Sequence, residues 1–437
     1  MVSRSLLRPD LSPLRGAEAR GFRAVFTSRT VAMLGSQAAE VALLVQAKHL
    51  TGSPLIVGLL GMAELVPLVV FGLYGGALAD RVDRRALMRR CEPGLACCAG
   101  LLLVNALLPH PAVWPLFAVS AAMMALASLQ RPAFEAAIPR VVSRDQIPAA
   151  VAVLSMSTNA SVLLGSSLGG ILAISPGPWL VYALDAAAFA GSFVLLGRLP
   201  KLPPRTGEAD QATPGPALRE ILVGLRYAVS RKDLLGSYLA DLSAMIFAYP
   251  NALFPFMAVE LHAPWSTGLL FAAPSAGAFA VSATSGWMSR VRRHGQAIAA
   301  AAATWGAAMA GFGLSPDVYA AIGFLLIAGG ADELSAIFRD IMWNQSIPDA
   351  LRGRMAGIEL LSYAAGPPAG QLRSGVIAAA ADVRFSLTSG GLACVAAVTT
   401  VFVILPQFRG YRADALEESG GRSGVTPRCS APNLGDD

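Results

Sequence analysis

Charged residues are scarce in this chain. Asp, Glu, Lys and Arg together make up 14% of its 437 residues, whereas hydrophobic residue types make up 54%. A typical soluble protein carries about 25% charged residues. A chain with so few charges has too little polar surface to face water on all sides. The shortage argues against a string of soluble domains and indicates an integral membrane protein.

Histidine and cysteine are also rare, and their positions exclude several kinds of site. The four histidines lie at the ends of apolar runs or between them, so a histidine proton relay in mid-membrane is excluded. The five cysteines have the spacing of neither a disulfide framework nor a zinc site, and we predict no metal and no cofactor. The zinc-protease pattern His-Glu-x-x-His and the nucleotide-binding P-loop are absent as well, which argues against an enzyme.

Twelve apolar runs dominate the rest of the chain. A helix needs roughly 20 apolar residues to cross the hydrocarbon core of a membrane. Runs of that kind lie near residues 26–48, 54–79, 87–108, 113–134, 150–174, 180–197, 235–258, 267–287, 296–314, 318–338, 355–379 and 385–405. The pattern predicts an all-α integral membrane protein with twelve transmembrane helices.

Positive charge is concentrated in every second connection between the runs. The stretch 81–90, for example, is rich in arginine, whereas the alternate connections together contain a single arginine, Arg384. Connections rich in lysine and arginine remain in the cytoplasm. The asymmetry predicts that both termini are cytoplasmic. The longest connection, at about 198–233, divides the runs into six and six.

This division gives a domain prediction. We expect a cytoplasmic N-terminal segment (1–21), a six-helix bundle (22–198), a cytoplasmic linker with an amphipathic helix on the membrane surface (199–233), a second bundle (234–408) and a disordered cytoplasmic tail (409–437). A weak repeat relates the two halves, because an arginine precedes Ile-Pro by a similar distance at 131–139 and at 339–348. Two related halves with a substrate site between them are a transporter architecture.

The connection after the second run carries a family resemblance. The residues Gly-Ala-Leu-Ala-Asp-Arg-Val-Asp-Arg-Arg at 76–85 resemble the signature Gly-x-Leu-Ala-Asp-Arg-x-Gly-Arg-Arg/Lys of the major facilitator superfamily, although Asp83 replaces the usual glycine. The fifth run contains Gly-Ser-Ser-Leu-Gly-Gly at 165–170, which is similar to an exporter motif that has proline in place of Ser166. Across most of the chain the pattern is similar to the enterobactin-exporter and macrolide-efflux group.

The resemblance implies roles for two sets of residues. The first set forms a gate at the cytoplasmic face, and its alternative role is to fix the topology by charge alone: Gly76, Asp80, Arg81, Arg84, Arg85 and Arg131. The second set lets helices approach closely: Gly165, Gly169 and Gly170.

Polar residues inside the apolar runs are the candidates for transport chemistry, because charge at membrane depth is costly. They are Gln37, Glu40, Glu64, Asp185, Asp241, Asp332, Glu333 and Arg373. Burial favours the neutral form of a carboxyl group, so such an acid can load and release a proton. Glu40 is the first candidate for this role. The alternative for each residue is a structural hydrogen bond or ion pair, and Asp332 and Glu333 point about 100° apart on a helix, so at most one of them faces a cavity.

These observations favour a multi-pass transporter of the plasma membrane that works as a monomer. The leading hypothesis is proton-coupled export of a siderophore or an amphipathic drug-like molecule, with protons and the lipid bilayer as the other partners and no nucleic acid. An importer or symporter with the same fold is the alternative. A membrane receptor or scaffold that transports nothing is a more remote one.

Overall fold

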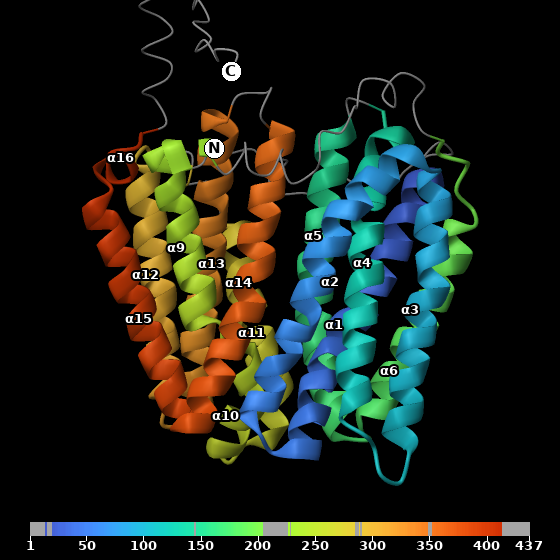
Figure 1. The fold of residues 1–437 in the computed structure, drawn as a ribbon, viewed down its shortest axis with the longest axis horizontal. Coiled ribbons are helices and arrows are strands. Elements are labelled where there is room, and N and C mark those ends of the chain that lie inside the picture. The colour runs from blue at the N-terminus through green and yellow to red at the C-terminus, as the bar shows by residue number, and fades with distance from the viewer. Residues whose placement is uncertain are drawn as a thin grey trace, which may run out of the picture.

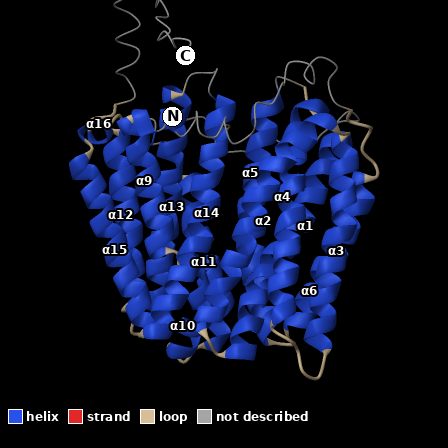
Figure 2. Cartoon of the chain, viewed as in Figure 1, coloured by secondary structure: helices blue, strands red, loops and turns tan. Residues whose placement is uncertain are grey.

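The structure is a computed structural model, which describes residues 14, 20–143, 146–203, 226–227, 229–284, 288, 291–347 and 352–412. The described part is helical and contains no strand (Figure 2). Its helices form two groups that stand side by side (Figure 1). The predicted amphipathic helix of the linker and the predicted tail lie mostly outside the described residues, and the domain boundaries stay a prediction.

The first group contains the helices from the first half of the chain: α1 (Arg20–Thr51), α2 (Pro54–Arg81), α3 (Arg84–Leu107), α4 (Trp114–Val141), α5 (Ile147–Ile174) and α6 (Pro178–Leu196). The second group contains α9 (Lys232–Ala248), α10 (Phe254–Glu260), α11 (Thr267–Ala283), α12 (His294–Gly313), α13 (Val318–Ser346), α14 (Arg352–Ala380), α15 (Val383–Ile404) and the short α16 (Pro406–Arg409).

Most of these helices fit a membrane. Ten helical segments of the described chain are long and apolar enough to cross one. Helices α12 and α14 lie alongside them in the second group (Figure 1). The twelve predicted runs coincide with these helices, but several helices extend further, as α4 does to Val141. Their extra turns carry arginines and other polar residues, so a search for apolar runs ends before them.

Proline interrupts the seventh predicted run and not the eleventh. The helix α9 ends at Ala248, and a 3-10 turn at Asn251–Leu253 joins it to α10. Pro250, which has no amide hydrogen to donate, lies at this break. By contrast, α14 contains Pro367 and Pro368 and runs through both as one helix.

Small residues let the helices of each group pack closely. A side chain added at Gly165 or at Gly169 would collide with the backbone of α1, near Leu34 and Ala38. Gly170 faces the other way and lies against Gly268 at the start of α11, in the second group. The three glycines therefore serve two different contacts, one inside the first group and one between the groups.

The two groups meet at one end of the molecule. The arginine-rich end carries the connection 82–83 between α2 and α3, and the opposite end carries the connections 52–53, 175–177 and 261–263. Near the opposite end, α2 packs on α14 and α5 packs on α11. Gly58 lies against the backbone of Gln371 and Gly375, and the Lys48 ammonium donates to the carbonyl of Pro255 at 2.6 Å.

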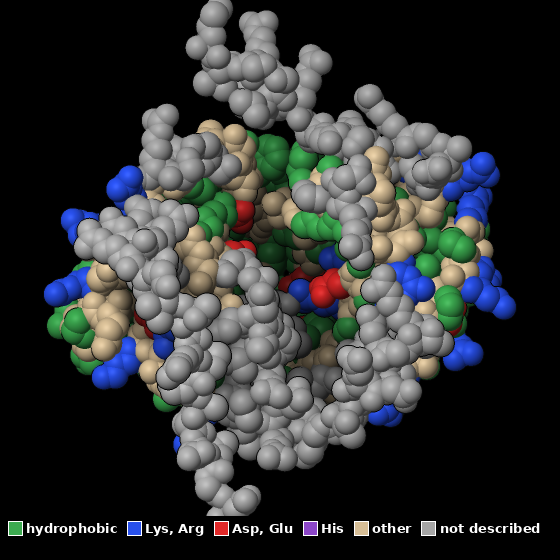
Figure 3. All heavy atoms as spheres, turned by 90° about the horizontal axis from the view of Figure 1, so that it is seen from above, with side chains coloured by type: hydrophobic (Ala, Val, Ile, Leu, Met, Phe, Trp, Pro, Cys, Tyr) green, Lys and Arg blue, Asp and Glu red, His purple; other side chains and the backbone are tan. Residues whose placement is uncertain are grey.

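The arginine-rich end is hollowed between the groups. Figure 3 looks onto this end and shows a central depression in which acidic and basic side chains are visible. Contact at one end and a hollow at the other give the described bundle a cavity that opens toward the arginine-rich end.

The glycines inside the first group give a first prediction. Gly169→Ala places a methyl group into the backbone of Ala38 and should lower the free energy of unfolding by about 1–3 kcal/mol, the usual cost of overpacking. Thermal unfolding of the purified protein in detergent measures this. Gly191→Ala is the matched control, because a methyl group there meets no atom within 4 Å. Equal melting temperatures for the two variants would contradict the packing role of Gly169.

Candidate functional site

A cavity of about 260 Å³ lies between the two groups of helices. Helix α1 contributes Gln37 and Glu40, and α13 contributes Asp332 from the other group. Tyr249, at the break after α9, and Trp305 of α12 add aromatic rings to its lining. The cavity therefore brings together two carboxyl groups that are almost 300 residues apart in the chain.

A second cavity of about 380 Å³ extends from the same place into the first group, and we call it the N-recess. Gln37 and Glu40 line both cavities, and Glu64 of α2 lines the N-recess. Much of the remaining lining is apolar and flexible, with the methionines Met33, Met123 and Met124 and the aromatic residues Phe134 and Phe189. Methionine side chains adapt readily to differently shaped ligands.

Two arginines line the N-recess. Arg29 of α1 lies over the ring of Phe134, with 6.0 Å from its guanidinium carbon to the ring centre. Arg131 of α4 pairs with Glu135 at 3.1 Å, and both side chains are about half exposed. The recess thus combines a flexible apolar wall with positive charge, which suits a molecule that is partly apolar and partly anionic.

The acids of the cavities lie close enough to influence one another. The amide of Gln37 donates to Glu40 at 3.1 Å. Tyr249 interacts electrostatically with Glu40, Glu64 and Asp332, and its hydroxyl accepts a hydrogen bond from Asn251 at 2.9 Å. Tyr249 therefore stands among the three acids.

The adjacent acids of α13 have different surroundings. Asp332 lines the central cavity, whereas Glu333 accepts a short hydrogen bond from Ser282 of α11. Only one of the two lines this cavity, as the helical geometry predicted.

Asp241 belongs to a buried ion pair rather than to a cavity. Its carboxylate pairs with Arg339 of α13, and both side chains are less than 10% exposed. The Arg339 guanidinium lies 5.9 Å from the centre of the Trp343 ring, which stacks on Tyr238. Asp241 lines neither cavity, so its contacts favour the structural alternative.

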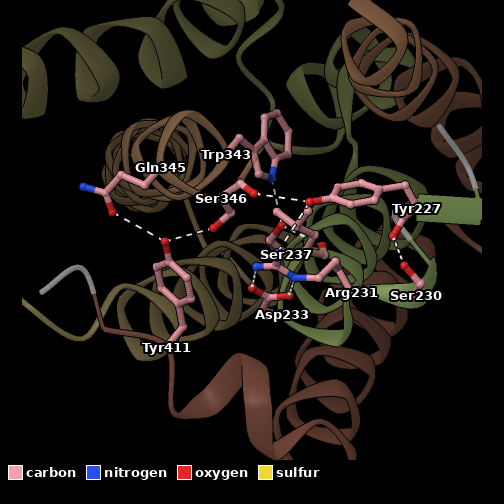
Figure 4. A network of polar contacts seen from close by, with 10 residues as sticks. Tyr227, Ser230, Arg231, Asp233, Ser237, Trp343, Gln345, Ser346 and Tyr411 are labelled. Carbon is pink, nitrogen blue, oxygen red and sulfur yellow. Dashed lines mark hydrogen bonds and ion pairs between the residues drawn. The ribbon is translucent and has the colours of Figure 1, made fainter. Parts of the chain in front are cut away.

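A polar network continues from this ion pair toward the arginine-rich end (Figure 4). The indole nitrogen of Trp343 donates to Ser237 at 2.9 Å. Arg231 binds both oxygens of Asp233, and the hydroxyl of Tyr411, which follows α16, lies 3.0 Å from that of Ser346. These contacts fasten the start of α9 and the segment after α16 to the end of α13.

The described contacts of Arg373, another candidate for transport chemistry, are structural hydrogen bonds. In the structure its guanidinium donates to the backbone carbonyls of Phe247 and Ser386. The first of these carbonyls precedes the break after α9, where the helical hydrogen bonds stop. Arg373 therefore supplies one donor to the main chain beside this break and another to the first turn of α15.

The predicted gate is described only in part. Gly76 and Asp80 lie within α2, but their surroundings are not described. Arg81 is exposed, Arg84 is buried and Arg85 donates to the carbonyl of Gly197 at 2.7 Å. Asp83 stands where the family pattern has glycine. Its carboxylate caps α3 by accepting a hydrogen bond from the amide of Ala86, and it also accepts one from the amide of Leu202 at 2.9 Å. Arg131, which belongs to the predicted gate, pairs with Glu135 among the described acids.

Sequence reasoning missed three polar residues. Arg29 lies in the first apolar run, and Gln130 lines the N-recess from α4. Glu92 of α3 is 1% exposed and accepts a hydrogen bond from Gln130 at 2.6 Å. Each was detectable as a polar residue within or beside an apolar run. Asp185, one of the predicted candidates for transport chemistry, is fully buried and lines neither cavity.

One enzyme-like pattern occurs without its structural context. Gly165 to Gly169 fit the hydrolase pattern Gly-x-Ser-x-Gly, which requires a sharp turn between a strand and a helix. Here the central serine, Ser167, lies inside α5 and donates to the carbonyl of Leu163 one turn earlier at 2.7 Å. The pattern therefore forms no nucleophile elbow.

Comparison with known proteins decides the family. The model of the major facilitator family described as a transmembrane secretion effector matches residues 9–419. This chain belongs to that family. It is a multi-pass membrane transporter and not an enzyme, as the sequence predicted.

Curated relatives and solved structures agree with this assignment. The chain is 28% identical to the enterobactin exporter EntS of Citrobacter koseri over 403 residues, which cover 90% of this chain and 93% of the relative. EntS of Shigella flexneri is equally similar over 399 residues, with the same coverage. A POT family transporter in complex with 5-aminolevulinic acid has a TM-score of 0.69 at 12% identity, over 89% of this chain and 96% of that one. A bacterial homologue of the lysosomal transporter Spinster has a TM-score of 0.66 at 13% identity, over 90% and 97%. These structures confirm the fold.

The ion pair of the second group gives a second prediction. Asp241→Ala leaves the Arg339 charge buried without its carboxylate, and should lower the free energy of unfolding by about 3–5 kcal/mol. The double variant Asp241→Ala, Arg339→Met removes both charges and should recover much of that loss. Melting temperatures in detergent measure both effects. A double variant that is no more stable than Asp241→Ala would contradict the pairing.

Proposed function

We propose that this protein is a proton-coupled exporter of a siderophore or a similar amphipathic molecule, and that it works by alternating access. The proposal includes twelve membrane spans, with α9, its 3-10 turn and α10 forming the seventh, and both termini in the cytoplasm. It places the protein in the plasma membrane as a monomer. Export and a siderophore substrate are supported by the relatives, which are named enterobactin exporters.

The central cavity carries the proposal. Glu40 and Asp332 line it from opposite groups of helices, and Gln37 and Tyr249 lie beside them. A carboxyl group in a poorly hydrated cavity exchanges a proton when its hydration changes. A movement of the two groups that opens the other end of the cavity would change the hydration of both acids. The site therefore links the movement of the groups to proton exchange.

The N-recess supports an amphipathic substrate with an anionic part. Arg29 and Arg131 supply positive charge, and methionine and phenylalanine side chains supply an adaptable apolar wall. Arginine binds the oxygens of acidic and phenolate groups through several donors, and stacks on aromatic rings. Catecholate siderophores combine these groups.

The arrangement of the groups supports an inward-open state. The contacts between Gly170 and Gly268, and between Lys48 and Pro255, close the end opposite the arginine-rich one. The arginine-rich end is the cytoplasmic one by the distribution of positive charge, and Figure 3 shows the hollow there. In this state the exporter would accept its substrate from the cytoplasm.

Transport by Glu40→Gln tests the proton role. Inverted membrane vesicles that are acidic inside and contain the wild-type protein should accumulate enterobactin, because protons leaving the lumen drive the substrate into it. Glu40→Gln removes an ionisable group from both cavities and should reduce this accumulation to the level seen without a pH gradient. Asp317→Asn is the control, because it removes an acid outside the cavities and keeps a residue that caps α13.

Two results would count against the proposal. Unchanged accumulation by Glu40→Gln would remove Glu40 from the proton role. Wild-type accumulation that requires vesicles acidic outside would indicate symport into the lumen instead of exchange.

Gly170→Ala tests the assignment of the state. A methyl group at this position collides with the backbone of Gly268, so the substitution should disfavour closure at the end opposite the arginine-rich one. Distances between spin labels at the outer ends of α5 and α11 should shift toward longer values in the variant. Gly191→Ala, which meets no neighbour, should leave the distances unchanged. If Gly170→Ala gave the wild-type distribution, this contact would have no role in closure.

A further inference from the structure

A seam of polar side chains runs through the interior of the first group, apart from both cavities. Toward the arginine-rich end, the hydroxyl groups of Ser28 on α1 and Ser192 on α6 lie 2.6 Å apart. Toward the opposite end, the hydroxyl of Tyr182 on α6 donates to Gln46 of α1 at 2.7 Å. Asp185 lies between these two hydrogen bonds on the same helix. Polar groups thus follow the contact between α1 and α6 over much of its length.

Asp185 is the one member of this seam whose polar atoms have no partner. Its exposed fraction is 0%, and neither carboxylate oxygen has a hydrogen-bond partner among the described residues. Gly35 on α1 provides the space for the carboxyl group, because a methyl group at Gly35 would lie 2.7 Å from one of its oxygens. The carboxyl group is therefore enclosed by helices and aimed at a glycine.

The surroundings of Asp185 offer no described cation. Glu92, on the neighbouring helix α3, is the charged group that interacts with it electrostatically, and Tyr182 on its own helix is the nearby phenol. Helix α5 contains no charged residue. On α1, Arg29 and Glu40 line the cavities instead. On α3, Arg89 lies over the ring of Phe193, about two turns from Asp185 along α6.

Glu92 provides a link between this interior and the N-recess. It is 1% exposed, its carboxylate accepts from Gln130 and it lies close to Ser192. Gln130 also lines the N-recess, as does Phe189, which follows Asp185 by about one turn of α6. A bound substrate that moves Gln130 or Phe189 would therefore alter the surroundings of both buried acids.

A proton is the ligand that fits this place. An ionised carboxylate without a partner is strongly disfavoured in an apolar interior, and such a group takes up a proton instead. Sodium and other hard cations need several oxygen ligands arranged around them. Among the described residues neither oxygen of Asp185 has a hydrogen-bond partner, and one of them lies against Gly35, which has no side chain to contribute.

We propose that Asp185, together with Glu92, forms a proton-binding site inside the first group of helices, separate from the substrate cavities. The proton binds to a carboxylate oxygen of Asp185 in the inward-open state and leaves when helix movement hydrates the seam. Substrate and proton then occupy different places and influence each other through Gln130 and Phe189. This inference rests on proton-coupled export for its role in transport, but the binding site itself can be tested without transport.

Infrared spectroscopy of the purified full-length protein in detergent provides that test. A protonated carboxyl group has a carbonyl band distinct from that of a carboxylate, and isotope-labelled aspartate shifts the bands of aspartate alone. The wild-type protein should show a protonated aspartate band near neutral pH, and Asp185→Asn should lose part of it. Glu92→Gln, which keeps Asp185, should shift the frequency of the Asp185 carbonyl band, because the two acids interact. Asp317→Asn, which removes an exposed acid, should leave the band unchanged.

The outcomes separate this site from the proposed function. Loss of the band in Asp185→Asn supports the site even if no siderophore is transported. A wild-type protein without a protonated aspartate band, or a band that Asp185→Asn and Glu92→Gln both leave unchanged, overturns the proposal. The isotope label gives the first of these results without any substitution, so a variant that fails to fold does not prevent the test.

In transport, Asp185→Asn should lose proton-driven accumulation and retain exchange of labelled for unlabelled substrate without a gradient.

Discussion

The hydrocarbon core of a membrane contains no water, so every backbone amide and carbonyl that crosses it needs a partner inside the protein. Helices meet this demand within each segment, and every regular element of the described chain is a helix. Where a backbone group has no partner within its own helix, a side chain can provide one. The break after α9 frees backbone carbonyls, and Arg373 donates to that of Phe247. The same constraint explains why an arginine at membrane depth donates to main-chain carbonyls here.

The two halves use related sequence positions in different ways. Arg131 and Arg339 occupy matching places in the internal repeat. Arg131 is half exposed and lines the N-recess, whereas Arg339 is buried against Asp241. The first half thus keeps an accessible charge beside a flexible apolar cavity, and the second half uses its charge for cohesion. The N-recess therefore lies in the first half, next to the buried acids Glu92 and Asp185.

Glycine contacts allow the halves to remain close at one end and separate at the other. Gly165 and Gly169 bind α5 to α1 inside the first half, whereas the adjacent Gly170 touches Gly268 across the boundary. At the contact between Gly170 and Gly268 there are no side chains that interlock. The two halves can therefore part there at a lower cost than helices whose side chains interlock.

The sequence by itself determined the helical class, the positions of the long apolar helices, the family and the set of acids from which the site is drawn. Apolar run length and the signature at 76–85 are local properties, so one sequence reveals them. The tertiary structure alone decided which acids share a cavity. A residue's place in the sequence fixes its direction on its own helix, but its partner depends on how that helix is rotated and packed. For this reason Glu40 meets Asp332 in a cavity, Asp241 meets Arg339 in a buried pair, and Asp185 lies against Gly35 without a hydrogen-bond partner among the described residues.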